Sequence, residues 1–277
     1  MVEIGSTNQL TVVRVTKPGH VLRDDEGREL LLPHKLGPRE LQVGDAISVF
    51  VYTDSEDRPI ATTQKPLAQV GDFACLKVVH VNEHGAFLDW GLDKDLFVPK
   101  SEQHVSMRVG QSYVVAVFLD GATERVAAAS KLGPFFDYDV SSLSEGKPVE
   151  LLAYDENDVG MLVIVDDRYS GMIHRSEIFR PVRVGDRLSG FVAKIRDDNK
   201  LDIRLRRTGQ SAQMDASALI LEALKSSGGV LPLGDKSPPA EIVQRLGISK
   251  KVFKAAVGAL YKSGQVIPGP KETRLKS

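Results

Sequence analysis

The sequence predicts a mainly β protein: three tandem five-stranded barrels of the OB type, followed by a small C-terminal winged-helix domain. Three observations lead to this fold class. Short segments of alternating apolar residues fill most of the chain, a Val-Gly-(Asp/Gln) phrase recurs before four of them, and no long helical period begins before residue 212. Alternation is typical of half-buried strands, and many short strands separated by turns favour barrels or sandwiches over a parallel sheet.

The recurring phrase sets the domain organisation. It reads "LQVGDAISVFV" from 41, "AQVGDFACLKVV" from 68, "MRVGQSYVVAVF" from 107 and "VRVGDRLSGFVAKI" from 182. Glycine supplies the backbone freedom that a tight turn requires, and the strands group into sets of a size suited to a five-stranded barrel. The expected domains are a first barrel over 1–66, a second over 67–133, a connector over 134–147, a third barrel over 148–208 and a winged helix over 212–270.

The last domain changes to a helical period. "DASALILEALKSSGG" has an apolar helical face and ends at Gly228. Ser237 is the expected cap of a second helix with Pro238 in its first turn, and Ser249 opens a third. The third helix is expected to bury one stripe, made of Val252, Phe253, Ala256, Val257, Leu260 and Tyr261. A short strand, "QVIPGP", completes the pattern of a winged helix-turn-helix.

Composition excludes several function classes. The 277 residues include one cysteine, Cys75, so a disulfide framework and paired-cysteine zinc spacing are both excluded. No segment approaches the ~20 apolar residues of a membrane helix, and no basic-then-apolar leader opens the chain. P-loop and GxSxG patterns are also absent from the sequence. We therefore expect a cytoplasmic protein that is not an enzyme and has no cofactor, no metal and no membrane partner.

The two halves of the chain differ strongly in charge. Residues 1–167 hold 15 Lys/Arg against 27 Asp/Glu, whereas residues 168–277 hold 21 against 10. A basic half in a nearly neutral protein suggests a polyanionic partner for that half. The alternative is that the acidic half offsets the basic one for solubility.

Two phenylalanines of the second barrel are the most informative residues. Alternation in "GAFLDWG" places Ala86, Leu88 and Trp90 on one face and Phe87 on the other. In "DLFVPKSE", Phe97 likewise lies opposite its apolar neighbours. If these rings are exposed on neighbouring strands, each can stack a nucleobase, at ~1–3 kcal/mol per base and without sequence preference. The alternative is that they cover a domain interface. Nearby cations that could contact phosphate are Lys100, Arg125 and Lys131.

"GAFLDWG…LFVPKSEQ" and "GMIHRSEIF…VRVGD" resemble the S1 RNA-binding motif, a barrel of the OB type. The order of three such barrels and a winged helix, with "SKKVFKAAVGALYKSGQV" in the last domain, resembles the conserved virulence factor B (YitL-like) family of bacterial RNA-binding proteins. The resemblance spans essentially the whole chain. It implies that Phe87 and Phe97 stack bases, that His174 matches the ring on the third strand of its barrel, and that Arg175 is its polar neighbour.

The first and third barrels depart from this motif. The first has no stacking aromatic at the matching positions, where His20 and His34 are the only rings. In the third, Leu162 and Met172 occupy the places of the two phenylalanines. The third barrel is instead rich in cations that could follow a phosphate chain. Its candidate RNA contacts, besides the two residues above, are Arg183, Lys194, Arg196, Arg204 and Arg206. We therefore expect RNA to cross both barrels, with bases on the second and phosphates on the third, or to bind only one.

The third helix of the last domain carries Lys251, Lys254 and Lys262 on roughly one face. A helix-turn-helix places its second helix in the major groove of DNA. This helix lacks the Arg, Asn or Gln side chains that make bidentate base contacts. The three lysines therefore indicate non-specific nucleic-acid contact, a protein interface or a solvated face.

Together these features predict non-catalytic binding of single-stranded RNA with low sequence specificity. The family resemblance implies a role in post-transcriptional regulation of gene expression. Two alternatives stay open: a winged-helix DNA-binding regulator, and a scaffold that docks on a ribosome or ribonuclease.

Overall fold

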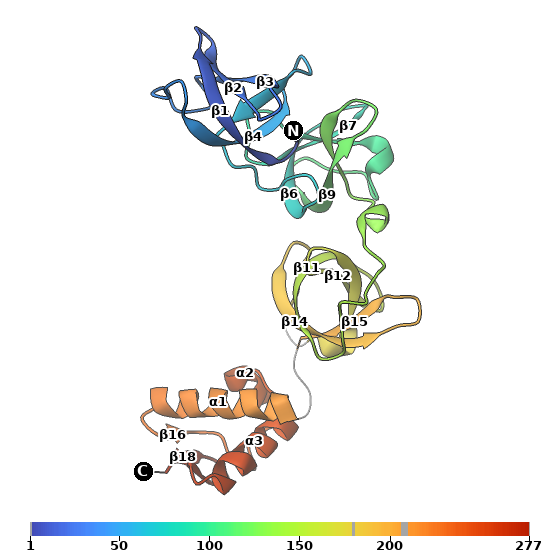
Figure 1. Ribbon diagram of the computed structural model, residues 1–277. Helices are drawn as coiled ribbons and strands as arrows, with labels where there is room; N and C mark the ends of the chain where they lie inside the picture. The colour runs from blue at the N-terminus through green and yellow to red at the C-terminus, as the bar shows by residue number, and fades with distance from the viewer. Residues whose placement is uncertain (1, 179–180, 206–209, 277) are drawn as a thin grey trace. The chain divides into compact units, whose positions relative to one another are not determined.

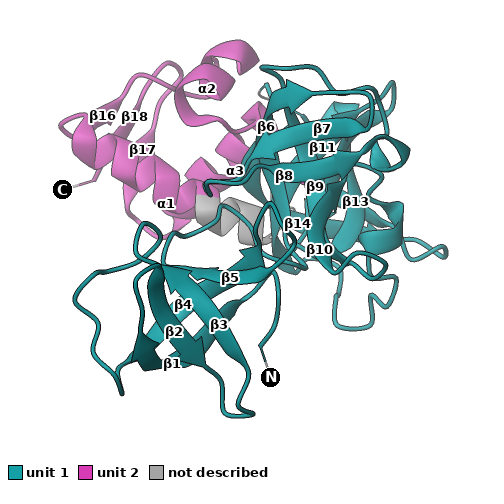
Figure 2. Cartoon of the chain, turned by 90° about the horizontal axis from the view of Figure 1, so that it is seen from above, with its two compact units in different colours: residues 1–203 teal, residues 204–277 magenta. Residues whose placement is uncertain are grey.

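The computed structural model describes residues 2–178, 181–205 and 210–276, without the side chains of 210–215. The chain divides into two compact units, residues 1–203 and 204–277, which Figure 2 colours teal and magenta. Three closed five-stranded barrels occupy the first unit, and helices with a small three-stranded sheet occupy the second (Figure 1). The predicted fold class is therefore confirmed.

The three barrels share one topology. The strands of the first barrel are β1 (Thr7–Val15), β2 (Gly19–Arg23), β3 (Glu29–Pro33), β4 (Ala46–Thr53) and β5 (Pro59–Thr62). The second has β6 (Phe73–Val81), β7 (Gly85–Asp89), β8 (Leu96–Pro99), β9 (Ser112–Asp120) and β10 (Arg125–Ala129). The third has β11 (Pro148–Glu156), β12 (Gly160–Val165), β13 (Tyr169–His174), β14 (Arg187–Ile195) and β15 (Leu201–Arg204). In each, the third and fifth strands pair in parallel, and the other pairs whose register is described are antiparallel.

The recurring Val-Gly-(Asp/Gln) phrase forms the turn before a strand each time. Its glycines, Gly44, Gly71, Gly110 and Gly185, have φ between 85° and 100°, a region that side chains other than glycine rarely adopt. Gly5 and Gly146 precede β1 and β11 with φ of 83° and 84°, although neither lies in the phrase. Each barrel thus has a glycine turn before its first and its fourth strand.

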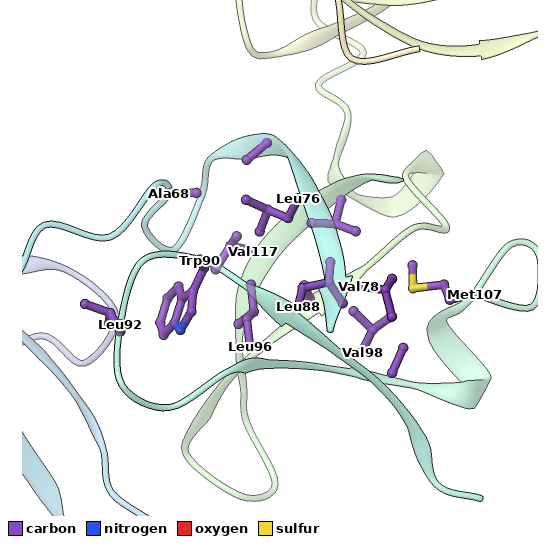
Figure 3. Close-up of a cluster of buried hydrophobic side chains, with 14 of the residues drawn as sticks. Ala68, Leu76, Val78, Leu88, Trp90, Leu92, Leu96, Val98, Met107 and Val117 are labelled. Carbon is purple, nitrogen blue, oxygen red and sulfur yellow. The ribbon is translucent and has the colours of Figure 1, made fainter. Parts of the chain in front are cut away.

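Alternation sorts the strand residues as predicted. In the second barrel Ala86 is buried. Leu88 and Trp90 are buried too, as are Leu96 and Val98 on β8 (Figure 3). This core continues into the first barrel, because the Trp90 ring meets Phe50 and Tyr52 edge-on, at centroid distances of 5.6 and 6.5 Å. The two barrels therefore share apolar packing and not only a linker.

The second and third barrels also share a core. Phe73 and Val114 of the second cluster with Leu152 and Ile164 of the third. Phe136 of the connector stacks on Phe73 at 5.7 Å. A guanidinium nitrogen of Arg187, on β14, donates to the Phe73 carbonyl oxygen at 3.2 Å. Three short 3₁₀ turns, Lys100–Glu102, Gly133–Phe135 and Arg175–Glu177, lie in the same unit.

The second unit consists of α1 (Gln210–Ser226), β16 (Val230–Leu231), α2 (Pro239–Leu246), α3 (Lys250–Lys262), β17 (Val266–Pro268) and β18 (Thr273–Leu275). Its core packs α1 against α3 through Ile220, Leu224, Phe253 and Leu260. The sheet order β16-β18-β17 places β18 in the centre. The predicted limit at residue 270 is therefore too short, because β18 lies beyond it.

Two details of this unit differ from the prediction. Ser237 does not cap α2: the cap position is Pro238, and the buried Ser237 hydroxyl instead accepts from the Gly234 amide at 2.9 Å. The proline pair at 238–239 fixes the extended entry to the helix. Tyr261 is 60% exposed rather than part of the buried stripe, since the stripe is already filled by Phe253 and Leu260. Ser249 caps α3 as predicted, accepting from the Val252 amide.

Candidate nucleic-acid interface

Phe87 and Phe97 form a cross-strand pair on the outer face of the second barrel. They are directly opposed in the β7–β8 register, and their ring centroids lie 5.1 Å apart at an interplanar angle of 41°. Both residues are half-buried. The predicted face is thus confirmed, but the rings are less exposed than expected because each covers part of the other.

A third ring extends this pair, and sequence reasoning missed it. His80 is exposed on β6, and its ring centroid lies 5.6 Å from that of Phe87 at 40°. A β-bulge between Val78 and His80 brings the imidazole opposite Phe87. Because a bulge shifts the strict alternation by one residue, the sequence pattern alone does not reveal this position. We call His80, Phe87 and Phe97 the aromatic row.

The two phenylalanines line a pocket of about 640 Å³ whose lining includes three aspartates against one lysine and one arginine. The carboxylates of Asp93, Asp95 and Asp120 line it. Burial, and next the neighbouring Asp89 carboxylate, raise the pKa of Asp95. Carboxylates here could accept hydrogen bonds from the amino groups of a stacked base.

The cations of this pocket are held by the first barrel. Arg125 forms an ion pair with Asp57. The Lys94 ammonium donates to the carbonyl oxygens of Thr53 at 2.9 Å and Asp54 at 2.7 Å, and burial lowers its pKa. Of the three predicted second-barrel cations, Lys100, Arg125 and Lys131, only Arg125 lines the pocket of the aromatic row. Its charge there is neutralised by the ion pair with Asp57.

Lys100 and Lys131 do not line this pocket. Lys100 is exposed in the turn after β8, and Lys131 is exposed after β10, where it lines a different pocket described below. Neither ammonium has an ion-pair partner within 4.0 Å among the described residues. Both are thus available to a phosphate chain.

In the third barrel, Leu162 and Met172 occupy the register positions of the two phenylalanines, as expected. His174 lies two residues further along β13, opposite Gly160, a position that Pro99 holds in the second barrel. Met172, and not His174, is thus the register counterpart of Phe97, and the role of His174 as an RNA-contacting ring stays a prediction.

His174 instead joins a charge cluster. Its Nε2 lies 3.1 Å from Asp202 Oδ1, and Arg196 Nε donates to the same oxygen at 2.9 Å. Arg196 NH2 also lies 3.2 Å from His174 Nε2. Burial opposes ionisation of Asp202, but the hydrogen bonds from Arg196 and His174 outweigh it, so the net effect is a lowered pKa. The structure brings His174 and Arg196 together, as an internally neutralised group.

The other predicted cations of the third barrel are dispersed. Arg175 donates to the Asn157 carbonyl oxygen at 3.0 Å and lies 3.4 Å from Glu156. Arg204 is half-buried at the end of β15, while Arg183 and Lys194 are exposed with no ion pair to a described residue. The remaining one, Arg206, lies outside the described residues.

In the winged-helix unit, one of the three predicted lysines of α3 is ion-paired and two are free among the described residues. Lys254 pairs with Asp235 at 2.6 Å, which holds the pKa of that carboxyl below its ordinary value. Lys251 and Lys262 are exposed and have no ion-pair partner among the described parts of the chain. Two free cations on one helix can contact phosphates without reading base sequence.

The described residues contain no group of three or more His, Cys, Asp or Glu side chains arranged to hold a metal ion. Within the same ranges, no helix combines the length and apolar character required to cross a membrane.

Family models match four consecutive parts of the chain. An S1 domain model matches residues 4–64 and 70–130. The model of the second domain of virulence regulatory factor CvfB matches 141–207, and a CvfB-like winged helix domain model matches 218–275. Together with the barrel topology, these matches place the chain in the class of multidomain proteins built from nucleic-acid-binding modules.

Relatives in known proteins cover nearly the full length. The chain is 29% identical over 269 residues to the uncharacterized protein YitL of Bacillus subtilis. This alignment covers 95% of this chain and 90% of that protein. It is 25% identical over 276 residues to conserved virulence factor B of Staphylococcus saprophyticus, with 94% and 90% coverage. The chain belongs to the conserved virulence factor B family.

One solved structure aligns over the whole length. It is a multidomain protein with nucleic acid binding domains from Streptococcus pneumoniae, 25% identical, with 98% of each chain covered and a TM-score of 0.46.

Proposed function

We propose that this protein binds single-stranded RNA with little sequence preference, without catalysing a reaction, and acts in post-transcriptional regulation of gene expression. The observation that carries the proposal is the Phe87–Phe97 pair, two contacting rings on the outer face of an S1-type barrel that line one pocket. Aromatic faces stack any base, so such a pair binds unpaired polynucleotides without reading their sequence.

Free cations support the same proposal. Lys100 and Lys131 of the second barrel and Arg183 and Lys194 of the third are exposed and have no ion-pair partner among the described residues. Cations of this kind bind phosphates through counterion release, which makes the affinity fall with salt. The regulatory role is proposed because the matching family model is that of a virulence regulatory factor.

Fluorescence anisotropy tests the proposal. Labelled single-stranded RNA, single-stranded DNA and duplex DNA of equal length are titrated with the full chain at two salt concentrations. We expect preference for single-stranded RNA, and affinity that falls as salt rises. The double variant Phe87→Ala/Phe97→Ala should weaken RNA binding by at least fivefold, from ~1 kcal/mol or more of lost stacking.

The matched control is Val21→Ala/Leu31→Ala, since these residues form the corresponding outer-face pair of the first barrel. It should leave RNA affinity unchanged.

Two outcomes would favour other functions. A preference for duplex DNA that is lost in Lys251→Ala/Lys262→Ala would replace the proposal with a winged-helix DNA-binding regulator. No binding to any of the three nucleic acids would favour a scaffold that docks on a ribosome or ribonuclease.

A further inference from the structure

A second pocket lies at the junction of the second and third barrels, within the first compact unit. Its volume is about 790 Å³, and its walls come from three places: the end of the second barrel, the connector and the outer face of the third barrel. The third barrel contributes Tyr154 of β11, Leu162 of β12 and Ser170 of β13. Leu162 is the register counterpart of Phe87, so this pocket covers the face that corresponds to the aromatic row.

The connector adds rings to this face beside Tyr154, the ring that β11 supplies. Phe136 stacks on Phe73 and contacts the ring of Tyr154, with centroids 5.8 Å apart. Tyr138 is 54% exposed and lines the same pocket. Its hydroxyl donates to the Gly133 carbonyl oxygen at 3.1 Å, so an exposed aromatic ring is fixed in position rather than free to rotate away.

The connector is itself held to the third barrel. Arg168 Nε donates to Asp137 Oδ2 at 2.8 Å, and the Asp137 amide donates to the Arg168 carbonyl oxygen at 3.0 Å. This two-way contact lies next to Tyr138 in the chain. A ring that is already positioned loses little conformational entropy when a ligand stacks on it.

Cations from both barrels line the pocket. Lys131 comes from the second barrel, and Lys200 comes from the turn between β14 and β15 of the third. Asp155 is the one carboxylate among the lining residues. Lys200 pairs with the exposed Asp198 at 3.1 Å, whereas Lys131 has no ion-pair partner among the described residues. With two lysines against one carboxylate, the junction pocket is more basic than the pocket of the aromatic row, where three aspartates line the wall and both cations are engaged.

The hydroxyl of Tyr154 adds a polar group inside this pocket. Burial raises the pKa of Tyr154, so its phenol stays neutral at physiological pH and can donate or accept a hydrogen bond. A partly buried neutral hydroxyl beside an exposed ring and two ammonium groups matches the parts of one nucleotide: a base edge, a base face and a phosphate.

We propose that the junction pocket is a second nucleotide-binding site for the same single-stranded RNA, with a base stacked on Tyr138 and the adjoining phosphates on Lys131 and Lys200. This inference rests on the proposed function, because it extends the RNA path from the aromatic row to the third barrel. In this arrangement the connector replaces the stacking residues that Leu162 and Met172 do not provide.

Variants of Tyr138 separate ring stacking from other effects. In anisotropy titrations of labelled single-stranded RNA, Tyr138→Ala should weaken binding by roughly 5- to 150-fold, the range for one lost base stack. Tyr138→Phe keeps the ring but loses the hydroxyl bond to Gly133, so it should bind more weakly than the wild type and much more tightly than Tyr138→Ala. Tyr138→Leu keeps apolar bulk without a π face and should resemble Tyr138→Ala. The salt dependence should be unchanged in all three.

Lys131→Ala should change the salt dependence that the Tyr138 variants leave unchanged. For a single strand, the slope of log affinity against log salt should become shallower by about 0.7. A direct readout uses RNA that carries 5-iodouridine, which crosslinks to stacked aromatic side chains on irradiation. Mass spectrometry should locate a crosslink at Tyr138 as well as at the aromatic row. Thermal melts of each variant confirm that an exposed substitution has left the fold intact.

The outcomes distinguish this site from the proposed function. If the wild type binds no RNA, both fail. If the wild type binds and Phe87→Ala/Phe97→Ala weakens it, but Tyr138→Ala binds normally and no crosslink falls on the connector, the junction site is overturned and the proposed function stands. Weakening by Tyr138→Ala equal to that of Tyr138→Phe would also overturn it, since the ring would not be the contact.

Discussion

Nε2 of His174 lies 3.1 Å from Oδ1 of Asp202, and the same carboxylate oxygen accepts two hydrogen bonds from Arg196. Asp202 is the least exposed of the three side chains, at 17% against 38% for Arg196. Two of the residues that the sequence offered as RNA contacts on the third barrel, His174 and Arg196, are therefore engaged with an acid of the barrel itself. The carboxylate limits how strongly this barrel can attract phosphate.

Removal of the Asp202 carboxylate should free the Arg196 guanidinium to contact phosphate. We expect Asp202→Asn to bind single-stranded RNA more tightly at low salt and to steepen the slope of log affinity against log salt by about 0.7, the value for one additional phosphate contact. Anisotropy titrations over a salt series measure both. Asp158→Asn removes the same charge from an exposed hairpin turn of this barrel, so an equal effect there would show that only net charge matters.

The same substitution should reduce stability. Hydrogen bonds to charged groups contribute ~1.5–3 kcal/mol when buried, but Arg196 is more than one third exposed, so screening reduces the expected loss to about 1 kcal/mol. Because Asp202 has a lowered pKa in the folded chain, its contribution is present above its ordinary value of 3.8 and is lost as pH falls below that value. Urea midpoints of wild type and Asp202→Asn should therefore differ at pH 7 and converge below pH 3.8. A gap that persists unchanged to lower pH would contradict the assignment.

Trp90 should be a principal residue in the junction of the first two barrels. It is 2% exposed, packs edge-on against Phe50 and Tyr52, and donates from Nε1 to the Lys94 carbonyl oxygen at 2.6 Å. We expect Trp90→Ala to cost about 3–5 kcal/mol through the cavity it leaves. Trp90→Phe should cost about 1–2 kcal/mol, since the ring remains and one hydrogen bond is lost.

Urea denaturation followed by circular dichroism measures these losses. Because Trp90 is the one tryptophan of the chain, the wild-type emission should be blue-shifted and resistant to acrylamide quenching. Red-shifted, easily quenched emission from the folded wild type would mean that the shared core of the two barrels does not exist in solution.

The fold was predictable because its signals are local. The alternation around Leu88 and Leu96 depends only on the two-residue period of a strand, so it identified the faces of Phe87 and Phe97 before any coordinates. The glycine turns were predictable where a Val-Gly phrase marked them. Gly5 and Gly146 form the same kind of positive-φ turn before a strand, but they do not lie in the Val-Gly phrase. The sequence pattern therefore did not identify them.

The site was less predictable because it depends on register and on distant partners. The bulge that brings His80 to Phe87 leaves no sequence signature. The partner of Arg125 is Asp57, in another barrel. Tyr138 lay in a segment read only as a connector, since nothing local indicates that it lines a pocket with Tyr154. Composition identified the cations, but only pairing in three dimensions shows which of them are free.

The glycine that begins the second strand of each barrel should be intolerant of any side chain. A Cβ on Gly85 would lie 2.2 Å from the Val98 carbonyl oxygen and 2.8 Å from the Phe97 ring, and the counterparts Gly19 and Gly160 face strand carbonyls at 2.2 and 2.1 Å. Contacts this short to backbone cannot be relieved by a rotamer change. We therefore expect Gly85→Ala to destabilise the second barrel by about 1–3 kcal/mol.

The same variant should weaken RNA binding, because the strand that carries Phe97 must move away from the added methyl group. Gly121→Ala is the matched control: its Cβ would have no atom within 4 Å, and both stability and affinity should stay close to wild type. Trp90 fluorescence in urea reports on the second barrel, and anisotropy reports on RNA. Normal stability of Gly85→Ala would show that β7 and β8 do not approach this closely, and the contact between Phe87 and Phe97 would lose its structural basis.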